Sequence, residues 1–243
     1  MNKPVLVFCS CIKVFAPTKI SDPIIRKKHY VDSIKFFIAN SNIQRIIVVE
    51  NTNSNWIDEE ILTLAKKNKK LLEFILFEGD IDLAIKHSIG YSHFEMVYTA
   101  INNSKILNKN DSLLVMDGRY IIKNINLIYD KLINGNCAFM PEIHNFKKNN
   151  LCDLRLYMVT QSIFLNYFWT KRFNLTNKRD GWAEYIVDTI IKSKRFKIDH
   201  FRILPRSIGI QGSTGVNWDG NNLFYYYFKM TYIYIFHNVF RYK

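Results

Sequence analysis

Short apolar runs alternate with longer amphipathic segments through the first half of the chain. The apolar runs have the length of buried strands, and the segments between them carry apolar residues at the three- and four-residue spacing of a helix. We expect strands at 5–12, 44–49, 72–77 and 112–116, and helices at 26–39, 56–67 and 94–106. This alternation predicts an α/β fold of the Rossmann type, a mostly parallel sheet with helices on both faces.

The pattern continues less regularly in the second half of the chain. It indicates a helix at 125–132, a strand at 137–140, polar or basic loops at 144–150 and 171–179, and a helix at 182–193. From residue 223 the sequence is dense in Tyr and Phe, with scattered basic residues. We therefore predict one domain over residues 1–220, followed by an aromatic and basic C-terminal tail at 221–243.

Composition adds a strong positive charge to this picture. The 243 residues include 34 Lys and Arg against 21 Asp and Glu, a formal charge of +13. Such a surface attracts anions: nucleic acid, anionic lipid or phosphorylated small molecules. The four cysteines form no CxxC pair, which favours reduced core thiols and a cytoplasmic location. We expect no signal peptide and no spanning helix, because the sequence contains no apolar run of about 18 residues.

Ligands of parallel α/β sheets bind at the carboxyl ends of the strands, so the residues after each strand are candidates for the site. Glu50 and Asn51 follow the second strand and could accept hydrogen bonds from a base or ribose, or could simply form a polar turn with a helix N-cap. Lys86 and the run from Gly90 through Tyr91 to Glu95 come just before the next helix or in its first turn. There they could bind phosphate or form a solvated loop.

The fourth strand ends in Asp117, Gly118 and Arg119. Asp117 would lie beside a donor diphosphate and is the candidate ligand for a divalent metal, Mg²⁺ or Mn²⁺. Gly118 permits close approach of the backbone, and Arg119 suits a phosphate or a leaving diphosphate. The alternative is an ordinary strand-to-loop turn.

Two later segments also carry candidate chemistry. Glu184 lies one turn into the helix that follows Asp180, where a carboxylate could act as general base on a sugar hydroxyl or could simply face solvent. Ser213 and Thr214 stand between glycines in a turn whose backbone N–H groups could wrap a phosphate.

Taken in order, these segments resemble the small glycosyltransferases of bacterial capsule and lipopolysaccharide loci. The matching positions are Glu50 and Asn51, the residues 90–95, the residues 118–120, Glu184, and the residues 212–215. The resemblance covers most of the chain up to Gly215 and implies a GT-A-like fold. The chain departs from the pattern at Val115, where a Lys is expected, and at Asp117, where a Thr is more usual. It also has no Asp-x-Asp motif at the end of the fourth strand, where Asp117 is followed by Gly118 and Arg119, and this leaves metal dependence open.

The resemblance implies transfer of a sugar from a nucleotide-sugar donor to a glycan or a lipid-linked glycan. Asp117 and Arg119 would then lie by the donor phosphates, and Glu184 would deprotonate the acceptor hydroxyl. The expected location is the cytoplasm, with peripheral contact to the inner face of the cytoplasmic membrane. The aromatic tail, which carries Lys229, Arg241 and Lys243, could make that contact or could close the core instead.

Three other functions fit parts of the sequence. A nucleic-acid-binding protein would explain the charge and the 15% aromatic content, but the basic residues are scattered and no RNA- or DNA-binding motif is present, so no nucleic-acid partner is expected. A nucleotidyltransferase or a phosphoribosyl-type transferase would present a similar phosphate-binding edge. The third alternative is an inactive scaffold at the membrane.

Overall fold

The structure is a computed structural model, and it describes most of the chain. The described residues are 3–14, 18–135, 137–141, 152–176, 178, 183–193, 199–201, 203–210, 215, 217–219, 222–224, 226–228 and 230–231.

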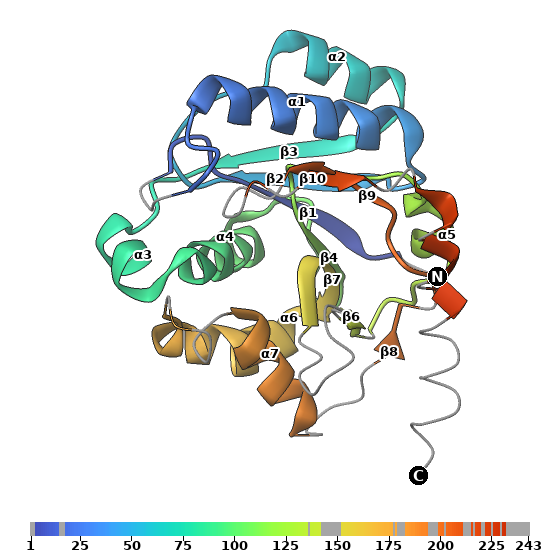
Figure 1. Cartoon of the computed structure of the whole chain (residues 1–243). Coiled ribbons are helices and arrows are strands. Elements are labelled where there is room, and N and C mark those ends of the chain that lie inside the picture. The colour runs from blue at the N-terminus through green and yellow to red at the C-terminus, as the bar shows by residue number, and fades with distance from the viewer. Residues whose placement is uncertain are drawn as a thin grey trace.

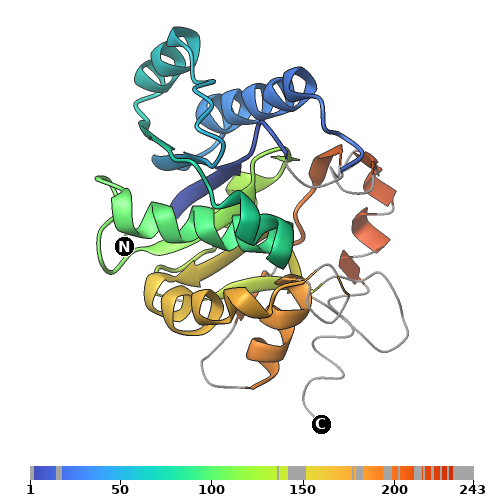
Figure 2. The same cartoon turned by 90° about the vertical axis from the view of Figure 1, so that its left-hand side faces the viewer.

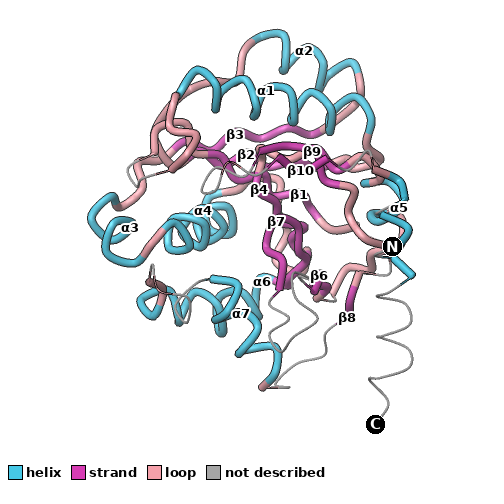
Figure 3. The backbone as a smooth tube through the Cα atoms, in the orientation of Figure 1, coloured by secondary structure: helices cyan, strands magenta, loops and turns pink. Residues whose placement is uncertain are grey.

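A seven-stranded sheet in the order β3-β2-β1-β4-β7-β6-β8 forms the centre of the molecule (Figures 1 and 3). Its strands are β1 (Val5–Ser10), β2 (Arg45–Glu50), β3 (Leu71–Leu76), β4 (Ser112–Asp117), β6 (Ala138–Pro141), β7 (Cys152–Thr160) and β8 (Asp199–His200). The strands β1 to β4 pair in parallel, and β7 is antiparallel to both of its neighbours, β4 and β6. Within this sheet six strands therefore share one direction, because β6 and β8 are again parallel.

Helices cover both faces of the sheet (Figures 1 and 2). One face carries α1 (Pro23–Asn40), α2 (Glu59–Lys67) and α5 (Ile125–Tyr129). The other carries α4 (Ile89–Asn103), α6 (Gln161–Ile163), the π-helical segment η1 (Phe164–Phe168), the 3₁₀ segment η2 (Trp169–Asn174) and α7 (Ala183–Lys192), with α3 (Ile81–His87) leading into α4. The predicted mostly parallel α/β sheet with helices on both faces is confirmed.

Each strand of the parallel half contributes to two separate cores. In β1, Leu6 and Phe8 join the core under α1 and α2, whereas Val5 and Val7 join the core under α4. All six residues of β1 are buried, because both faces of the strand are covered. This is why the sequence shows an unbroken apolar run here rather than an alternating one.

A second, three-stranded antiparallel sheet follows the end of β4. It consists of β5 (Ile121–Ile122), β9 (Ser207–Ile210) and β10 (Asn217–Asp219), in the order β10-β9-β5. Gly209 has a φ of +145°, and a Cβ built on it would lie 2.8 Å from the carbonyl oxygen of Arg119. The glycine thus allows a segment far along the chain to pack directly against the loop after β4.

One predicted helix boundary and two predicted loops need correction. The helix expected from residue 56 begins at Glu59, because the Asp58 side chain caps it by accepting a hydrogen bond from the Ile61 N–H. The loop expected around Lys86 is instead the last turn of α3, and α4 begins at Ile89, so Glu95 lies in its second turn rather than its first. The first four residues of the expected basic loop at 171–179 belong to η2.

The last described segment, residues 222–231, is helical at 223–224, 226–228 and 230–231. Tyr226 and Met230 pack against the core under α1. The predicted domain boundary at residue 220 stays a prediction. In the part of the chain that the structure describes, no helix combines the length and the apolar character needed to span a bilayer.

A buried ion pair lies at the amino ends of β2 and β4, and it predicts how the stability of the fold depends on pH. The Arg45 guanidinium donates to both carboxylate oxygens of Asp111, at 2.6 and 3.0 Å, and the Asp111 side chain is only 2% exposed. Burial alone would raise the pKa of Asp111, but its hydrogen bonds from Arg45 and the Asn108 N–H, together with the Arg45 charge, hold that pKa below its usual value. The ion pair therefore stabilises the fold at pH values above the pKa that Asp111 has in the unfolded chain.

We expect this contribution to disappear as the pH falls below about 4, where the unfolded chain takes up the proton more readily than the folded one. Urea unfolding of the wild type and of Asp111→Asn should show a stability difference at pH 7 that shrinks steadily toward pH 3. A difference that stays constant over this range would contradict the assignment.

Candidate active site

The carboxyl ends of β1, β2, β3 and β4 meet at one edge of the sheet, and half of the predicted site residues lie at or beside it: Glu50, Asn51, Glu95, Asp117, Gly118 and Arg119. Cys9 of β1 is the register partner of Asp117 of β4, and Ser10 is the partner of Glu50 of β2. Beyond these positions the chain leaves the sheet in three loops and the short turn after Asp117. The sheet thus brings together residues that are up to 109 positions apart in the sequence, from Ser10 to Arg119.

Asp117 and Arg119 form an ion pair at the end of β4. Arg119 donates from Nη2 to Asp117 Oδ2 at 2.6 Å and from Nε to Oδ1 at 3.2 Å, and its backbone N–H also donates to Oδ1 at 3.2 Å. The Arg119 side chain is 12% exposed and the Asp117 side chain 27%. Burial would raise the pKa of Asp117, but the charge and hydrogen bonds of Arg119 hold it below its usual value. Asp117 is therefore ionised at neutral pH.

One nitrogen of Arg119 is left over from this pair. Its Nη1 is buried and has no hydrogen-bond partner among the described residues. The positive charge of Arg119 contributes to lowering the pKa of His29 and opposes the rise that burial causes in the pKa of Tyr30, so the guanidinium lies near these two side chains of α1. A buried N–H without an acceptor is costly, so this nitrogen indicates a place for an anionic ligand atom.

The loop between β1 and α1 is held over the strand end by Arg26, a residue that the sequence analysis missed. Its guanidinium donates to the carbonyl oxygens of Cys11 at 2.7 Å and Ile20 at 3.1 Å, and to the Tyr30 hydroxyl at 3.1 Å. Arg26 and Tyr30 are four positions apart on the buried face of α1. The sequence did contain a signal for Arg26, because an arginine on the apolar stripe of a helix needs buried hydrogen-bond acceptors.

Glu50 is fully buried, and the chain itself occupies its carboxylate. The carboxylate accepts hydrogen bonds from the backbone N–H groups of Ile12, Thr52 and Ser54, and from the Thr52 hydroxyl, at 2.6–3.0 Å. Glu50 thereby fixes the loops after β1 and β2 against each other. The role of Glu50 in donor binding stays a prediction. Its observed role is to hold the loops after β1 and β2 together.

Asn51 and Glu95 flank the turn that contains Gly79. The Gly79 N–H donates to the Asn51 carbonyl oxygen at 2.9 Å, and a Cβ built on Gly79 would lie 2.9 Å from Glu95 Oε2. Glu95 Oε1 accepts a hydrogen bond from the Asp80 N–H at 3.2 Å. Burial raises the pKa of Glu95, the Asp80 N–H partly opposes this shift, and the Asp80 carboxylate adds to it.

Two acceptor atoms of this turn have no partner among the described residues. They are Asn51 Oδ1 and Glu95 Oε2, and both are buried. A ligand that donates N–H or O–H groups, such as a base or a ribose, would satisfy them. The structure thus brings together two of the predicted nucleotide-binding residues that are 44 positions apart in the sequence.

Three other predicted donor-binding residues make contacts of a different kind. Lys86 is exposed on α3. A Cβ built on Gly90 would lie 3.0 Å from the Cβ of Ala183, so Gly90 is where α4 and α7 pack closely. The Tyr91 ring stacks on Phe173 with centroids 6.2 Å apart. Their role in donor binding stays a prediction.

A buried polar pair under Asp117 was also missed. His93 of α4 lies with its Nε2 3.0 Å from the Tyr157 hydroxyl of β7. Burial lowers the pKa of His93 to about 4, even though the charge of Asp117 acts in the opposite direction. His93 is therefore neutral at physiological pH and can share one proton with Tyr157. The two residues are 64 positions apart in the sequence, so only their meeting in space reveals the pair.

The remaining predicted residues lie wholly or partly outside the described part. Ser213 and Thr214 lie outside the described residues, and of Glu184 only the backbone, in α7, is described. A Cβ built on Gly215 would lie 3.5 Å from the Cβ of Lys19. The described end of the turn between β9 and β10 therefore meets the loop after β1, on the same side as Arg26.

The metal predicted at Asp117 would depend largely on ligand atoms. Within the described residues, no group of three or more His, Cys, Asp and Glu side chains could hold a metal ion. Asp117 Oδ2 accepts one hydrogen bond and keeps a free lone pair. Mg²⁺ is often held by one or two carboxylates together with substrate phosphates, so this single carboxylate fits such an ion only when a phosphorylated ligand is bound. The metal stays a prediction.

Comparisons with known proteins give weak likenesses. No protein-family model matches the chain, and no curated protein matches it either. Among solved structures, the chain is similar to the glycosyltransferase GlyE of Streptococcus pneumoniae, with 11% identity and a TM-score of 0.49 over 82% of this chain. The chain spans only 45% of the length of GlyE.

Two further structures resemble the chain over most of both lengths. One is a nucleoside-diphosphate-sugar pyrophosphorylase of Vibrio cholerae, with 8% identity and a TM-score of 0.46 over 81% of this chain and 90% of that one. The other is described as a putative nucleotide-diphospho-sugar transferase of Desulfovibrio desulfuricans, with 13% identity and a TM-score of 0.44 over 82% and 80%. At these scores the likenesses assign neither a substrate nor a residue role to this chain.

Proposed function

We propose that the chain is a glycosyltransferase that moves a sugar from a nucleotide-sugar donor to a growing capsule or lipopolysaccharide glycan. The observation that carries the proposal is the Asp117–Arg119 pair at the carboxyl edge of the sheet, with Arg119 Nη1 buried and unpartnered in the described structure. A buried cation with a free N–H at this edge is suited to a donor phosphate.

The donor would span the edge from β2 to β4. Its base or ribose would donate hydrogen bonds to Asn51 Oδ1 and Glu95 Oε2, and its diphosphate would accept one from Arg119 Nη1. When the bond between sugar and phosphate breaks, negative charge grows on the leaving diphosphate. Arg119 is already held in place by Asp117, so it would stabilise that charge without reorganising.

The acceptor hydroxyl must lose a proton as the new bond forms. We assign this step to Glu184, whose place at the start of α7 follows from the sequence. Ser213 and Thr214, which stand before Gly215 in the sequence, would offer backbone N–H groups to the phosphates. A divalent cation at Asp117, if the enzyme uses one, would supply additional neutralisation of the diphosphate.

A nucleotide screen tests the proposal. Ligands that bind the native state raise the thermal midpoint, so we expect a rise with at least one of UDP, GDP, CDP and CMP, measured with and without Mg²⁺ or Mn²⁺. The variant Glu95→Gln should reduce the rise for the best nucleotide. The control Glu73→Gln, which alters a carboxylate that accepts the Lys105 N–H away from this edge, should preserve it.

The products of turnover separate the candidate reactions. Incubation with the matching sugar nucleotides should release a nucleoside mono- or diphosphate, as sugar transfer requires. Release of pyrophosphate from a nucleoside triphosphate would instead indicate a nucleotidyltransferase. No midpoint rise with any nucleotide would contradict the donor site.

A further inference from the structure

The helical residues of the segment 222–231 present large apolar side chains to solvent. Leu223, Phe224, Tyr227 and Phe228 are 47%, 85%, 63% and 58% exposed. Their spacing of one, three and one positions puts all four on one side of a helix. We call these four side chains the aromatic face. Monomeric proteins seldom leave so many neighbouring large apolar groups in water without a binding role.

An adjoining side of the same segment, which carries Tyr226 and Met230, is fixed to the domain. The Tyr226 hydroxyl donates to the Leu204 carbonyl oxygen at 3.1 Å and accepts from Asn124 Nδ2 at 3.1 Å. The Met230 sulfur accepts a hydrogen bond from the Leu204 N–H at 3.2 Å. Because these contacts hold the segment by one side, the aromatic face has a fixed outward orientation.

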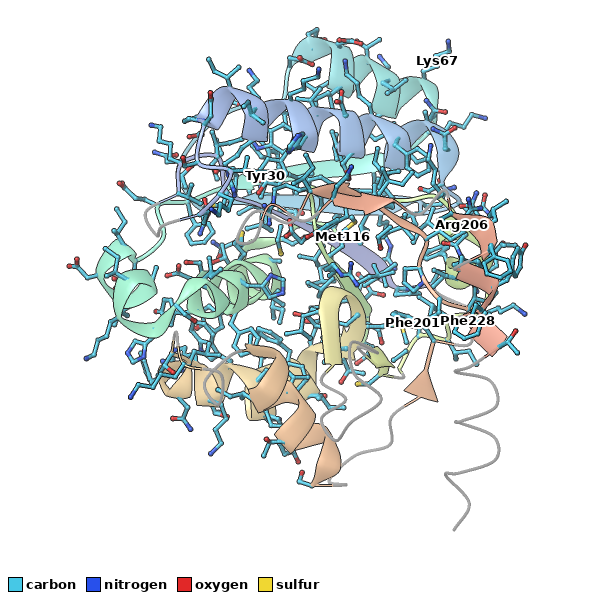
Figure 4. The ribbon with its side chains drawn as sticks, viewed as in Figure 1. Tyr30, Lys67, Met116, Phe201, Arg206 and Phe228 are labelled. Carbon is cyan, nitrogen blue, oxygen red and sulfur yellow. The ribbon has the colours of Figure 1, made fainter. Side chains whose placement is uncertain are left out.

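Basic and apolar groups continue around the aromatic face. The Arg206 guanidinium lies 5.7 Å from the centroid of the Tyr226 ring, and the backbone N–H of the exposed Lys123 donates to the Arg206 carbonyl oxygen at 3.0 Å. The helix that follows Asn124, α5, adds the 59% exposed Leu127. Arg206 and Phe228 lie on the same side of the molecule, away from Lys67 at the end of α2 (Figure 4).

We propose that the aromatic face docks on the interface of an anionic lipid bilayer. Phe and Tyr side chains favour the headgroup region, where an apolar ring can enter while a hydroxyl stays in water. Neighbouring cations such as Arg206 and Lys123 attract anionic headgroups, and the formal charge of +13 adds a long-range attraction. A segment held by one side with its apolar side outward lies in the interface plane rather than spanning it.

The docking segment lies beside α5 and the amino terminus, on the amino-terminal side of the sheet and away from the candidate active site (Figure 1). Arg206 directly precedes β9, which pairs with β5, and β5 begins two residues after Arg119. These two short strands link the docking segment to the edge where the donor is proposed to bind. The docking itself is independent of the proposed reaction, because it requires neither donor nor turnover.

Sedimentation with vesicles tests the proposal on the full chain. We expect the protein to bind vesicles of phosphatidylcholine and phosphatidylserine more tightly than vesicles of phosphatidylcholine alone. The double variant Phe224→Ser, Phe228→Ser should weaken binding to the anionic vesicles by about tenfold or more, because two exposed rings no longer enter the interface. The thermal midpoint should stay unchanged, since both side chains are exposed.

The matched control removes two comparably exposed apolar side chains elsewhere. Leu62 of α2 and Leu71 of β3 are 45% and 57% exposed, and Leu62→Ser, Leu71→Ser should bind vesicles as the wild type does. Equal weakening by both double variants would overturn the proposal, as would no binding of the wild type to anionic vesicles. Light scattering that shows a wild-type dimer and a monomeric Phe224→Ser, Phe228→Ser variant would assign the face to a second copy instead.

Discussion

We expect Arg119→Lys to lower kcat/KM for the nucleotide-sugar donor by about a hundredfold or more, with the fold retained. Removal of a single preorganised donor to a developing oxyanion typically costs that much. Lysine keeps the positive charge beside Asp117 but not the fork of the guanidinium, so one ammonium would have to serve both the carboxylate and the phosphate. Steady-state kinetics with the donor found in the nucleotide screen would measure the loss.

The chain provides a matched control for this substitution at the opposite edge of the same sheet. Arg45 and Asp111 form a pair of the same kind, with Arg45 Nη1 2.6 Å from Asp111 Oδ2, but at the amino ends of β2 and β4. Arg45→Lys should lower the thermal midpoint about as much as Arg119→Lys while leaving kcat/KM near the wild-type value. Equal kcat/KM in the two variants would remove Arg119 from the mechanism.

The parallel half of the fold could be predicted because its buried strands appear in the sequence as short apolar runs. Strands covered on both faces need apolar residues along most of their length, and β1, β2 and β4 have them at all positions except their ends. The ends of helices were less predictable, since they depend on single capping side chains such as Asp58 and Asp80. The periodicity of the segment starting at Trp56 continued past the cap because Trp56 is buried without being helical.

Elements that depend on distant partners could not be predicted. The strand β5 has two residues and exists because β9, some 85 positions later, pairs with it. The segment at 154–168 is mixed in sequence because β7 runs antiparallel between two strands and then turns at once into α6 and η1. Short strands carry too few residues to show a period, so only long-range pairing defines them.

For the candidate site, the sequence predicted where residues lie in the fold better than it predicted their side-chain contacts. Asp117 and Arg119 were predicted at the carboxyl end of β4 from the position of the strand, and the structure places them there. The sequence did not show that Arg119 binds Asp117 and keeps one nitrogen free, or that Glu50 uses its carboxylate on the chain's own loops. Such details depend on side-chain directions that no spacing rule provides.

The second large effect that we expect is a loss of stability, caused by the addition of one methyl group beside the candidate site. In Gly118→Ala the new Cβ would lie 2.2 Å from Cε1 of the Phe8 ring. The ring cannot easily move, because it packs against Tyr30 and Trp56 with centroids 6.2 Å away in both cases. Overpacking of a tight core typically costs 1–3 kcal/mol, and we expect about 3 kcal/mol here, measured by urea unfolding.

A double-mutant cycle with Phe8→Leu separates this steric effect from a backbone effect. The φ of Gly118 is outside the left-handed range that favours glycine, so the alanine backbone itself is unstrained. Phe8→Leu should lower stability in the wild type but recover at least about 1 kcal/mol in the Gly118→Ala background, because the smaller side chain makes room for the methyl group. Strictly additive losses would show that the ring does not limit this position. Recovery would mean that the close approach of Gly118 to Phe8 sets the position of the turn that carries Asp117 and Arg119, so that core packing under α1 determines where the donor phosphates can bind.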